Sequence, residues 1–265
     1  MALTNEQLER YSMNSEEDYK GINAEDFLRM DYSSVTLVDL REPDDAALAK
    51  SLLLYAVTDR RWLKDGENLK DAVAAAVDGG ATMIQLREKN LSAEKTIEEA
   101  KELKSILTEK QIPLIIDNSI EITVRSGADG VHLGQDDCPV ADARKQLGQS
   151  VIIGATAHNV DEAIKAERDG ADYLGVGAAF GSSTKSDAKP IVSLEEYKKI
   201  TEAVSIPVVA IGGIDESNIM RLNGLGLSGF AVVSAVFSKD DVRAAAERMK
   251  KLALQAKTGC LLICL

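Results

Sequence analysis

The sequence lacks the features that would place it in a membrane or on a nucleic acid. No apolar run approaches the roughly 20 residues that a membrane-spanning helix requires, and the N-terminal stretch MALTNEQLERYSMNSEED is too acidic and polar for a signal peptide. Lysine and arginine form no block, and the formal net charge is −12, so we expect binding neither to nucleic acid nor to an anionic membrane surface. We therefore predict a cytoplasmic protein in which a local group of cations would hold any anionic ligand.

Cysteine and histidine are scarce as well. The three cysteines, Cys138, Cys260 and Cys264, lack the spacing of metal ligands, and we expect them to be thiols without a chemical role. Of the two histidines, His132 lies inside an apolar run and is interpreted as a core residue, whereas His158 could either reach a site or support a helix start. No serine–histidine–aspartate grouping or cysteine with a neighbouring base is visible, so covalent catalysis has little support.

The sequence is rich in a repeated pair of features, in which a glycine closes a helical stretch and a short apolar run follows. Glycine suits the left-handed position after a helix, and an apolar run without alternation is typical of a strand that is covered on both faces. Eight apolar runs occur, at residues 53–58, 82–87, 112–116, 130–133, 151–155, 172–177, 206–211 and 229–234. Helical patterns lie between them, so the sequence predicts an α/β fold, a (β/α)8 TIM barrel over residues 51–257, with a doubly wound open sheet as the alternative.

The two ends of the chain do not join this pattern. Residues 3–12 resemble the opening of the enzymes that adenylate sulfur-carrier proteins, and residues 22–45 resemble the opening of a rhodanese domain. Neither stretch is long enough to be a domain, and the catalytic cysteine loop of rhodaneses is missing. We predict a short N-terminal extension over residues 1–50, either a strand and helix or a disordered leader without sulfur transfer, and a C-terminal tail over residues 258–265.

Polar residues follow the predicted strands at their C-terminal ends, where TIM barrels carry their active sites. Arg87 and Lys89 alternate at the end of the second strand, so their side chains should point to the same side, and Lys185 comes from the loop after the sixth strand. With Asp117 and Asp137 they predict a site for an anion and a metal ion, because magnesium usually takes one or two carboxylates and completes its shell with water and phosphate oxygens. A salt-bridge network on the rim is the alternative.

A second anion pocket is predicted at the ends of the seventh and eighth strands, in AIGGI (210–214) and AVVSAV (231–236). Barrels often bind phosphate at this place through backbone N–H groups, and Gly212 and Gly213 have no Cβ to obstruct an anion. A simple tight turn is the alternative interpretation of the glycine pair.

Six motifs, in order and with matching spacing over about 200 residues, resemble the thiamine-phosphate synthase family. They are LYAVTD (54–59), QLREK (85–89), ADGVHLGQDD (128–137), GADYLGVGAAFGSSTK (170–185), IPVVAIGGI (206–214) and AVVSAVF (231–237). The resemblance implies a magnesium-dependent transferase that joins hydroxymethylpyrimidine diphosphate to thiazole phosphate and releases diphosphate. The alternatives are a thiazole phosphate tautomerase and a non-catalytic barrel that binds thiamine intermediates. The partners are then small-molecule substrates, and the sequence leaves open whether the chain forms a homo-oligomer.

The resemblance also implies roles for individual residues. Gln85 would read the pyrimidine, Arg87, Lys89 and Lys185 would clamp the diphosphate, and Thr156, in place of a serine, would donate a hydrogen bond to it. The residues expected at the thiazole phosphate are Ser182, Thr184, Gly213, Val233 and Ser234.

The predicted metal site departs from the family pattern. After the third strand the family has asparagine then aspartate, whereas this chain has Asp117 then Asn118. The second metal carboxylate has either moved by one residue or been replaced by the Asn118 carbonyl oxygen. We place Asn118 with Asp137 as metal ligands and Asp117 with the substrate-binding residues.

Overall fold

The computed structural model describes residues 45–63, 66–181 and 191–258 of the 265, all within the unit Arg41–Leu265. The predictions for residues 1–44 and for the tail beyond residue 258 lie outside the described residues, as do Ser182, Thr184 and Lys185. None of the described helices is both long and apolar enough to cross a membrane.

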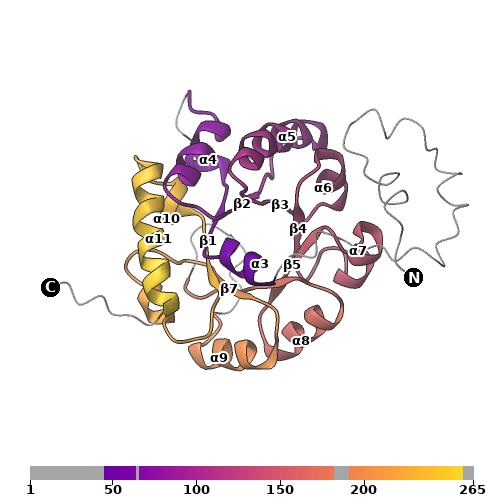
Figure 1. Ribbon diagram of the computed structural model, residues 1–265, viewed down its shortest axis with the longest axis vertical. Helices are drawn as coiled ribbons and strands as arrows, with labels where there is room; N and C mark the ends of the chain where they lie inside the picture. The colour runs from indigo at the N-terminus through magenta and orange to yellow at the C-terminus, as the bar shows by residue number, and fades with distance from the viewer. Residues whose placement is uncertain (1–44, 64–65, 182–190, 259–265) are drawn as a thin grey trace, which may run out of the picture. The chain divides into compact units, whose positions relative to one another are not determined.

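Eight parallel strands form a closed barrel, as predicted (Figure 1). They are β1 (Leu54–Val57), β2 (Met83–Leu86), β3 (Leu114–Asp117), β4 (Gly130–Leu133), β5 (Ile152–Ala157), β6 (Tyr173–Val176), β7 (Val208–Ile211) and β8 (Gly229–Val232). Each strand pairs with its neighbours in sequence, and β1 closes the ring against β8, with Leu54 opposite Phe230. The strands are buried on both faces, which is why each appears in the sequence as an uninterrupted apolar run.

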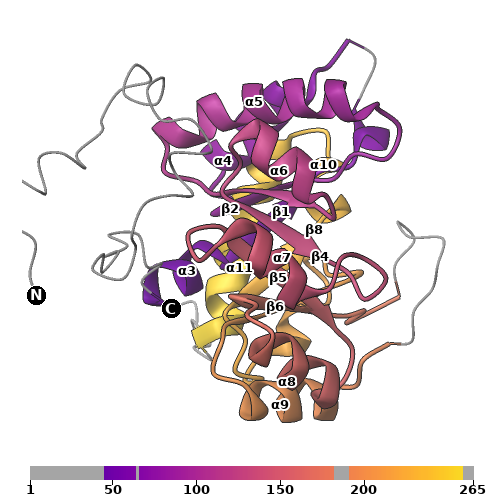
Figure 2. The same cartoon turned by 90° about the vertical axis from the view of Figure 1, so that its right-hand side faces the viewer.

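Helices surround the strands (Figures 1 and 2). They are α4 (Leu69–Asp78), α5 (Ala93–Glu109), α6 (Ile120–Ser126), α7 (Val140–Leu147), α8 (Val160–Arg168), α9 (Leu194–Ala203), α10 (Ser234–Phe237) and α11 (Val242–Thr258). Polar side chains cap the N-termini of several of these helices. At the start of α8, for example, the Asn159 Oδ1 atom accepts a hydrogen bond from the Glu162 N–H at 2.9 Å. The seventh strand is an exception, because the segment after it has only the short 3₁₀ helix η4 (Ile219–Leu222) before glycines with positive φ at Gly224 and Gly226.

The barrel interior is closed at its N-terminal end by α3 (Asp45–Ser51), which lies across the ring of strands in Figure 1. Leu48 and Leu52 are buried with interior residues such as Tyr55 and Tyr173. Helix α3 therefore crosses the boundary predicted at residue 50 and contributes side chains to the barrel core.

Glycines inside the barrel make room for polar side chains. A Cβ atom at Gly154 would lie 2.4 Å from the Tyr173 hydroxyl, and one at Gly175 would lie 2.8 Å from the His132 ring. Any larger residue at these positions would displace those side chains. The two glycines thus reserve the interior space in which the polar groups described next are held.

Candidate active site

A chain of buried hydrogen bonds crosses the barrel interior from β2 to β5. Gln85 Nε2 donates to the Tyr55 hydroxyl at 2.7 Å, and the Tyr55 and Tyr173 hydroxyls lie 2.9 Å apart. The Tyr173 hydroxyl lies 3.0 Å from His132 Nδ1, and His132 Nε2 lies 3.0 Å from Thr156 Oγ1. His132 is therefore a core residue, as predicted, but it also joins two of the predicted site residues, Gln85 and Thr156.

The two tyrosine hydroxyls of this chain can act as donors as well as acceptors. Burial raises the pKa of both Tyr55 and Tyr173, so each hydroxyl carries its single proton. Tyr55 accepts from Gln85. Between the two tyrosine hydroxyls either oxygen can be the donor, because each has one proton and two lone pairs. The roles of the two His132 ring nitrogens depend on the tautomer, so Thr156 Oγ1 accepts from Nε2 in one tautomer and donates to it in the other.

Arg87 follows directly on β2 and lies between two carboxylates. Its NH1 atom is 3.7 Å from Asp59 Oδ2, and its Nε atom is 3.7 Å from Asp117 Oδ2, at the end of β3. The Arg87 side chain is 11% exposed. At 3.7 Å neither contact is a hydrogen bond, so the guanidinium is oriented by charge and can turn its N–H groups to a third, anionic partner.

Asp59 is ionised in this arrangement. Hydrogen bonds from Arg61, the shortest at 2.6 Å, and the charges of Arg61 and Arg87 hold the pKa of Asp59 below its usual value despite burial. The negative charge that orients Arg87 is therefore present at neutral pH.

Lys89 is exposed and lies beyond the end of β2. Because the strand ends at Leu86, strand alternation does not set the direction of the Lys89 side chain, contrary to the basis of the prediction. The Lys89 backbone N–H donates instead to the Glu88 carboxylate at 2.9 Å.

The predicted metal ligands follow two neighbouring strands. Asp137 lies in the turn after β4, where its Oδ2 atom accepts a hydrogen bond from the Gly134 N–H at 2.6 Å. Asn118 follows β3, is exposed, and has a left-handed backbone with φ of 57°. Within the described part of the chain, no three histidine, cysteine or acidic residues gather as a metal cluster. One carboxylate and one amide oxygen still suit magnesium, provided that phosphate oxygens and water complete its shell.

The glycine pair after β7 is required by the backbone. Gly212 and Gly213 have φ angles of 101° and 65°, and a Cβ atom at Gly213 would lie 2.5 Å from the Gly181 carbonyl oxygen. Val233 follows β8, the strand beside β7, and directly precedes α10, which begins at Ser234. The phosphate role of Gly213, Val233 and Ser234 stays a prediction.

His158 supports the start of α8. Its Nδ1 atom and its backbone N–H both lie 2.8 Å from Glu162 Oε2. Of the two roles left open for His158, the contacts match the support of the turn.

Tyr55, Tyr173 and Glu88 were not predicted from the sequence to belong to the site. The tyrosine hydroxyls inside apolar runs were nevertheless a signal, because a buried hydroxyl needs a hydrogen-bond partner.

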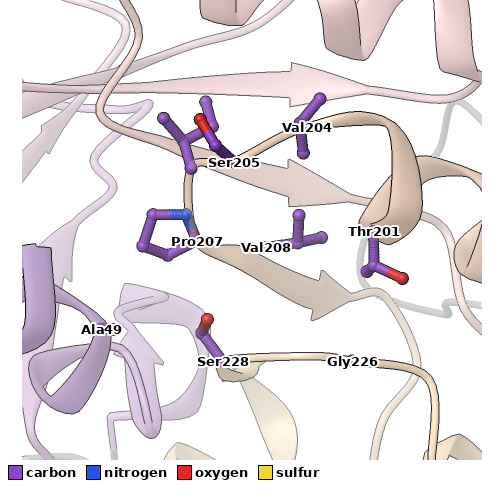
Figure 3. Close-up of a pocket in the computed structure, with 9 residues that line it drawn as sticks. Ala49, Thr201, Val204, Ser205, Pro207, Val208, Gly226 and Ser228 are labelled. Atoms are coloured by element: carbon purple, nitrogen blue, oxygen red, sulfur yellow. The ribbon is translucent and has the colours of Figure 1, made fainter.

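One pocket, whose lining Figure 3 shows, lies at the N-terminal end of the barrel, opposite to these residues. It has a volume of about 240 Å³ and lies where β7 and β8 begin, with Pro207 and Ser228 in its wall and Ala49 of α3 nearby. Its lining contains no charged residue. A second pocket of about 320 Å³ lies beside α10 and includes Lys239 and Asp215. Only the second is at the C-terminal end, where the predicted site residues follow their strands.

Comparison with known proteins repeatedly identifies one family. The family model described as "Thiamine monophosphate synthase" matches residues 54–236. The curated thiamine-phosphate synthase of Clostridium tetani is 46% identical over 196 residues, covering 74% of this chain and 93% of the relative. That of Chloroflexus aurantiacus is 46% identical over 199 residues, covering 75% and 91%.

Solved structures give the same result. The thiamine phosphate pyrophosphorylase from Pyrococcus furiosus has 38% sequence identity and a TM-score of 0.72, covering 79% of this chain and 98% of that structure. A 3-hexulose-6-phosphate synthase has a TM-score of 0.58 at 16% identity, which is a likeness of fold alone.

Proposed function

The chain belongs to the thiamine monophosphate synthase family, and we propose that the C-terminal mouth of its barrel joins hydroxymethylpyrimidine diphosphate to thiazole phosphate with release of diphosphate. The chain is a transferase of the thiamine-phosphate synthase type. The observation that carries the assignment of residues is the hydrogen-bond chain from Gln85 to Thr156. It holds Gln85, assigned to the pyrimidine, and the Thr156 hydroxyl, assigned to the diphosphate, at the two ends of one network.

The reaction needs charge stabilisation rather than a general base. The carbon–oxygen bond to the diphosphate breaks with its electron pair leaving on the diphosphate, and the lone pair of the thiazole nitrogen forms the new carbon–nitrogen bond. Negative charge grows on the departing group, so cations that are fixed in advance are the appropriate catalyst. Arg87, Lys89 and Lys185 would bind this group, and the Thr156 hydroxyl would donate to it.

The other substrate would lie at the ends of the last strands. Its phosphate and the groups next to it would be held by Ser182, Thr184, Gly213, Val233 and Ser234. In parallel barrels the loops after the seventh and eighth strands offer backbone N–H groups and hydroxyls to phosphate. The neighbouring positions of β7 and β8 support this assignment.

Asp137 and Asn118 would hold magnesium, and Asp117 would remain with Arg87. The 3.7 Å contact between Asp117 and Arg87 supports this division, because the Asp117 carboxylate already faces a cation. When bound, the metal ion would neutralise part of the charge on the diphosphate oxygens.

Two further points belong to the proposal. A tautomerase would need an acid or base such as His158, and the similarity to curated thiamine-phosphate synthases favours the synthase over that alternative. We also place the enzyme in the cytoplasm, acting on small-molecule substrates, as expected for a thiamine-phosphate synthase.

The test is release of diphosphate by the purified chain with both substrates, with either one alone, and with or without magnesium. Asp137→Ala should lower kcat/KM on the order of 10²-fold, as when one charge-stabilising group is removed elsewhere. Asp142→Ala is the matched control, because Asp142 is an exposed acid on α7 paired only with the surface residue Lys145 in the described structure. Wild-type turnover by Asp137→Ala, or release that needs only one substrate, would contradict the proposal.

A further inference from the structure

Glu88 is a buried carboxylate next to the site for which the transfer reaction has no use. Its side chain is 2% exposed, and Arg60 Nε donates to its Oε2 atom at 2.6 Å. Burial disfavours its charge, but the hydrogen bonds from Arg60 and from the Asn90 backbone outweigh that effect and lower its pKa. Glu88 is therefore charged at neutral pH inside a largely closed environment.

The two oxygens of Glu88 join different parts of the chain. Oε1 accepts from the backbone N–H groups of Lys89 at 2.9 Å and Asn90 at 3.0 Å, whereas Oε2 accepts from Arg60. Arg60 lies in η3 (Arg60–Trp62), directly after β1, and its NH2 atom also donates to Glu99 of α5 at 2.5 Å. The segment between β2 and α5 is thus attached, through one carboxylate, to the segment after β1 and to the helix that follows.

This attachment fixes the backbone from which Lys89 projects. Lys89 is past the end of its strand, so no strand hydrogen bond holds its peptide group in the described structure, and Glu88 supplies the contact instead. A hydrogen bond to a charged acceptor is shorter and stronger than a neutral one, which suits it to holding an exposed loop.

We propose that Glu88 is a positioning residue, which acts through the Lys89 and Asn90 backbone to keep the Lys89 ammonium where the leaving diphosphate is bound. The inference rests on the proposed role of Lys89. It adds that this cation is placed by a carboxylate beside it in sequence and by the Arg60 guanidinium behind that carboxylate.

Glutamine cannot replace Glu88 in this role. All of the partners of Glu88 are donors, two N–H groups on one oxygen and a guanidinium on the other. A carboxamide has one acceptor oxygen and one donor nitrogen, so in either orientation a donor faces a donor. Glu88→Gln therefore releases either the loop or Arg60 while keeping the size of the side chain.

The test is a double-mutant cycle on the full chain with Glu88→Gln, Lys89→Ala and the pair, measuring kcat/KM for both substrates. When Lys89 is unchanged, we expect Glu88→Gln to lower kcat/KM for the pyrimidine diphosphate about tenfold by raising its KM. The KM for thiazole phosphate should not change. In the Lys89→Ala background, the same substitution should have little further effect, because the side chain that Glu88 places is gone.

Glu167→Ala is the matched control for stability, because a glutamine there would keep the contacts that Oε1 makes. Glu167 also accepts two backbone N–H groups, those of Ser205 at 2.7 Å and Ile206 at 3.2 Å, but in the loop that precedes β7, at the opposite end of the barrel. It should lower the thermal midpoint as Glu88→Gln does, without raising the KM. Should Glu88→Gln fail to fold, Glu88→Asp enters the same cycle, since it keeps the charge but draws the carboxylate back from the loop.

Three results decide whether Glu88 positions Lys89. A fall in kcat/KM on Glu88→Gln that occurs only when Lys89 is present supports the inference. An equal fall in kcat/KM with Lys89 present and with Lys89→Ala overturns the inference about Glu88 but leaves the proposed role of Lys89 intact. Full activity of Lys89→Ala would instead refute the proposed role of Lys89, and the inference with it.

Discussion

Arg87→Lys should be nearly as harmful as removal of the side chain, although it keeps the charge. Arg87 presents NH1 to Asp59 and Nε to Asp117, each at 3.7 Å, so two different nitrogens face two carboxylates. At an effective dielectric constant near 20, unit charges at that distance attract by about 4 kcal/mol before desolvation. A lysine has one nitrogen and can lie close to only one of the two carboxylates, so the cation would shift toward that side.

The shift matters for the rate because only stabilisation that grows toward the transition state accelerates the reaction. A cation displaced from the path of the leaving diphosphate loses most of that contribution. We expect kcat/KM to fall about 10²-fold, or close to 3 kcal/mol of transition-state stabilisation. Stability should change little, since Asp59 keeps its 2.6 Å contact with Arg61.

The assay is diphosphate release at low substrate concentration with magnesium, together with thermal unfolding of each variant. Arg61→Lys is the control, because Arg61 binds the same Asp59 carboxylate but has a side chain that is 56% exposed. It should retain nearly full activity. The reasoning is refuted if Arg87→Lys is as active as the wild type, or if Arg61→Lys loses as much as Arg87→Lys.

Two further predictions concern the barrel interior and its N-terminal end. Tyr173→Phe removes the hydroxyl that bonds Tyr55 and His132, and should lower the free energy of unfolding in urea by about 2–4 kcal/mol and reduce activity; an unchanged denaturation midpoint would argue against the buried chain. Arg144→Met removes hydrogen bonds to the carbonyl groups of residues 148, 151 and 170 and an ion pair with Asp172, at 2.6 Å, so unfolding should cost about 3 kcal/mol less. Its kcat/KM should stay at the wild-type value, and a selective loss of activity would contradict the separation of the two ends.

The sequence was sufficient to predict the barrel because its physical signal is local. Each parallel strand is buried on both faces, so each of the eight apolar runs overlaps one strand, as where run 82–87 contains Met83–Leu86. Strands β3 and β5 extend past the ends of their runs, at residues 116 and 155. The segment after β7 could not be predicted as well, because glycines at positions 224 and 226 break the helical pattern and leave only η4.

The site could be predicted only in part. The rule that polar residues gather after barrel strands selected Arg87, Asp117 and Thr156, whose positions depend mainly on their own strands. Their contacts come from other strands, as between Thr156 and His132, and the same buried network joins Tyr55 to Tyr173, which are 118 residues apart. Such pairs depend on the closed barrel and its register, and a single sequence does not contain that information.

The exchange at residues 117 and 118 shows how register decides chemistry. Asp117 pairs with His132 across β3 and β4, so its side chain belongs to the layer that faces the barrel interior, where Arg87 lies. Asn118 lies one residue further, in the left-handed region that asparagine adopts more readily than most residues. A carboxylate at position 117 instead of 118 therefore lies in contact with Arg87, rather than in the turn that follows the strand. On the proposed assignment, the metal site then has one protein carboxylate, Asp137, and the diphosphate itself must supply the remaining negative oxygens.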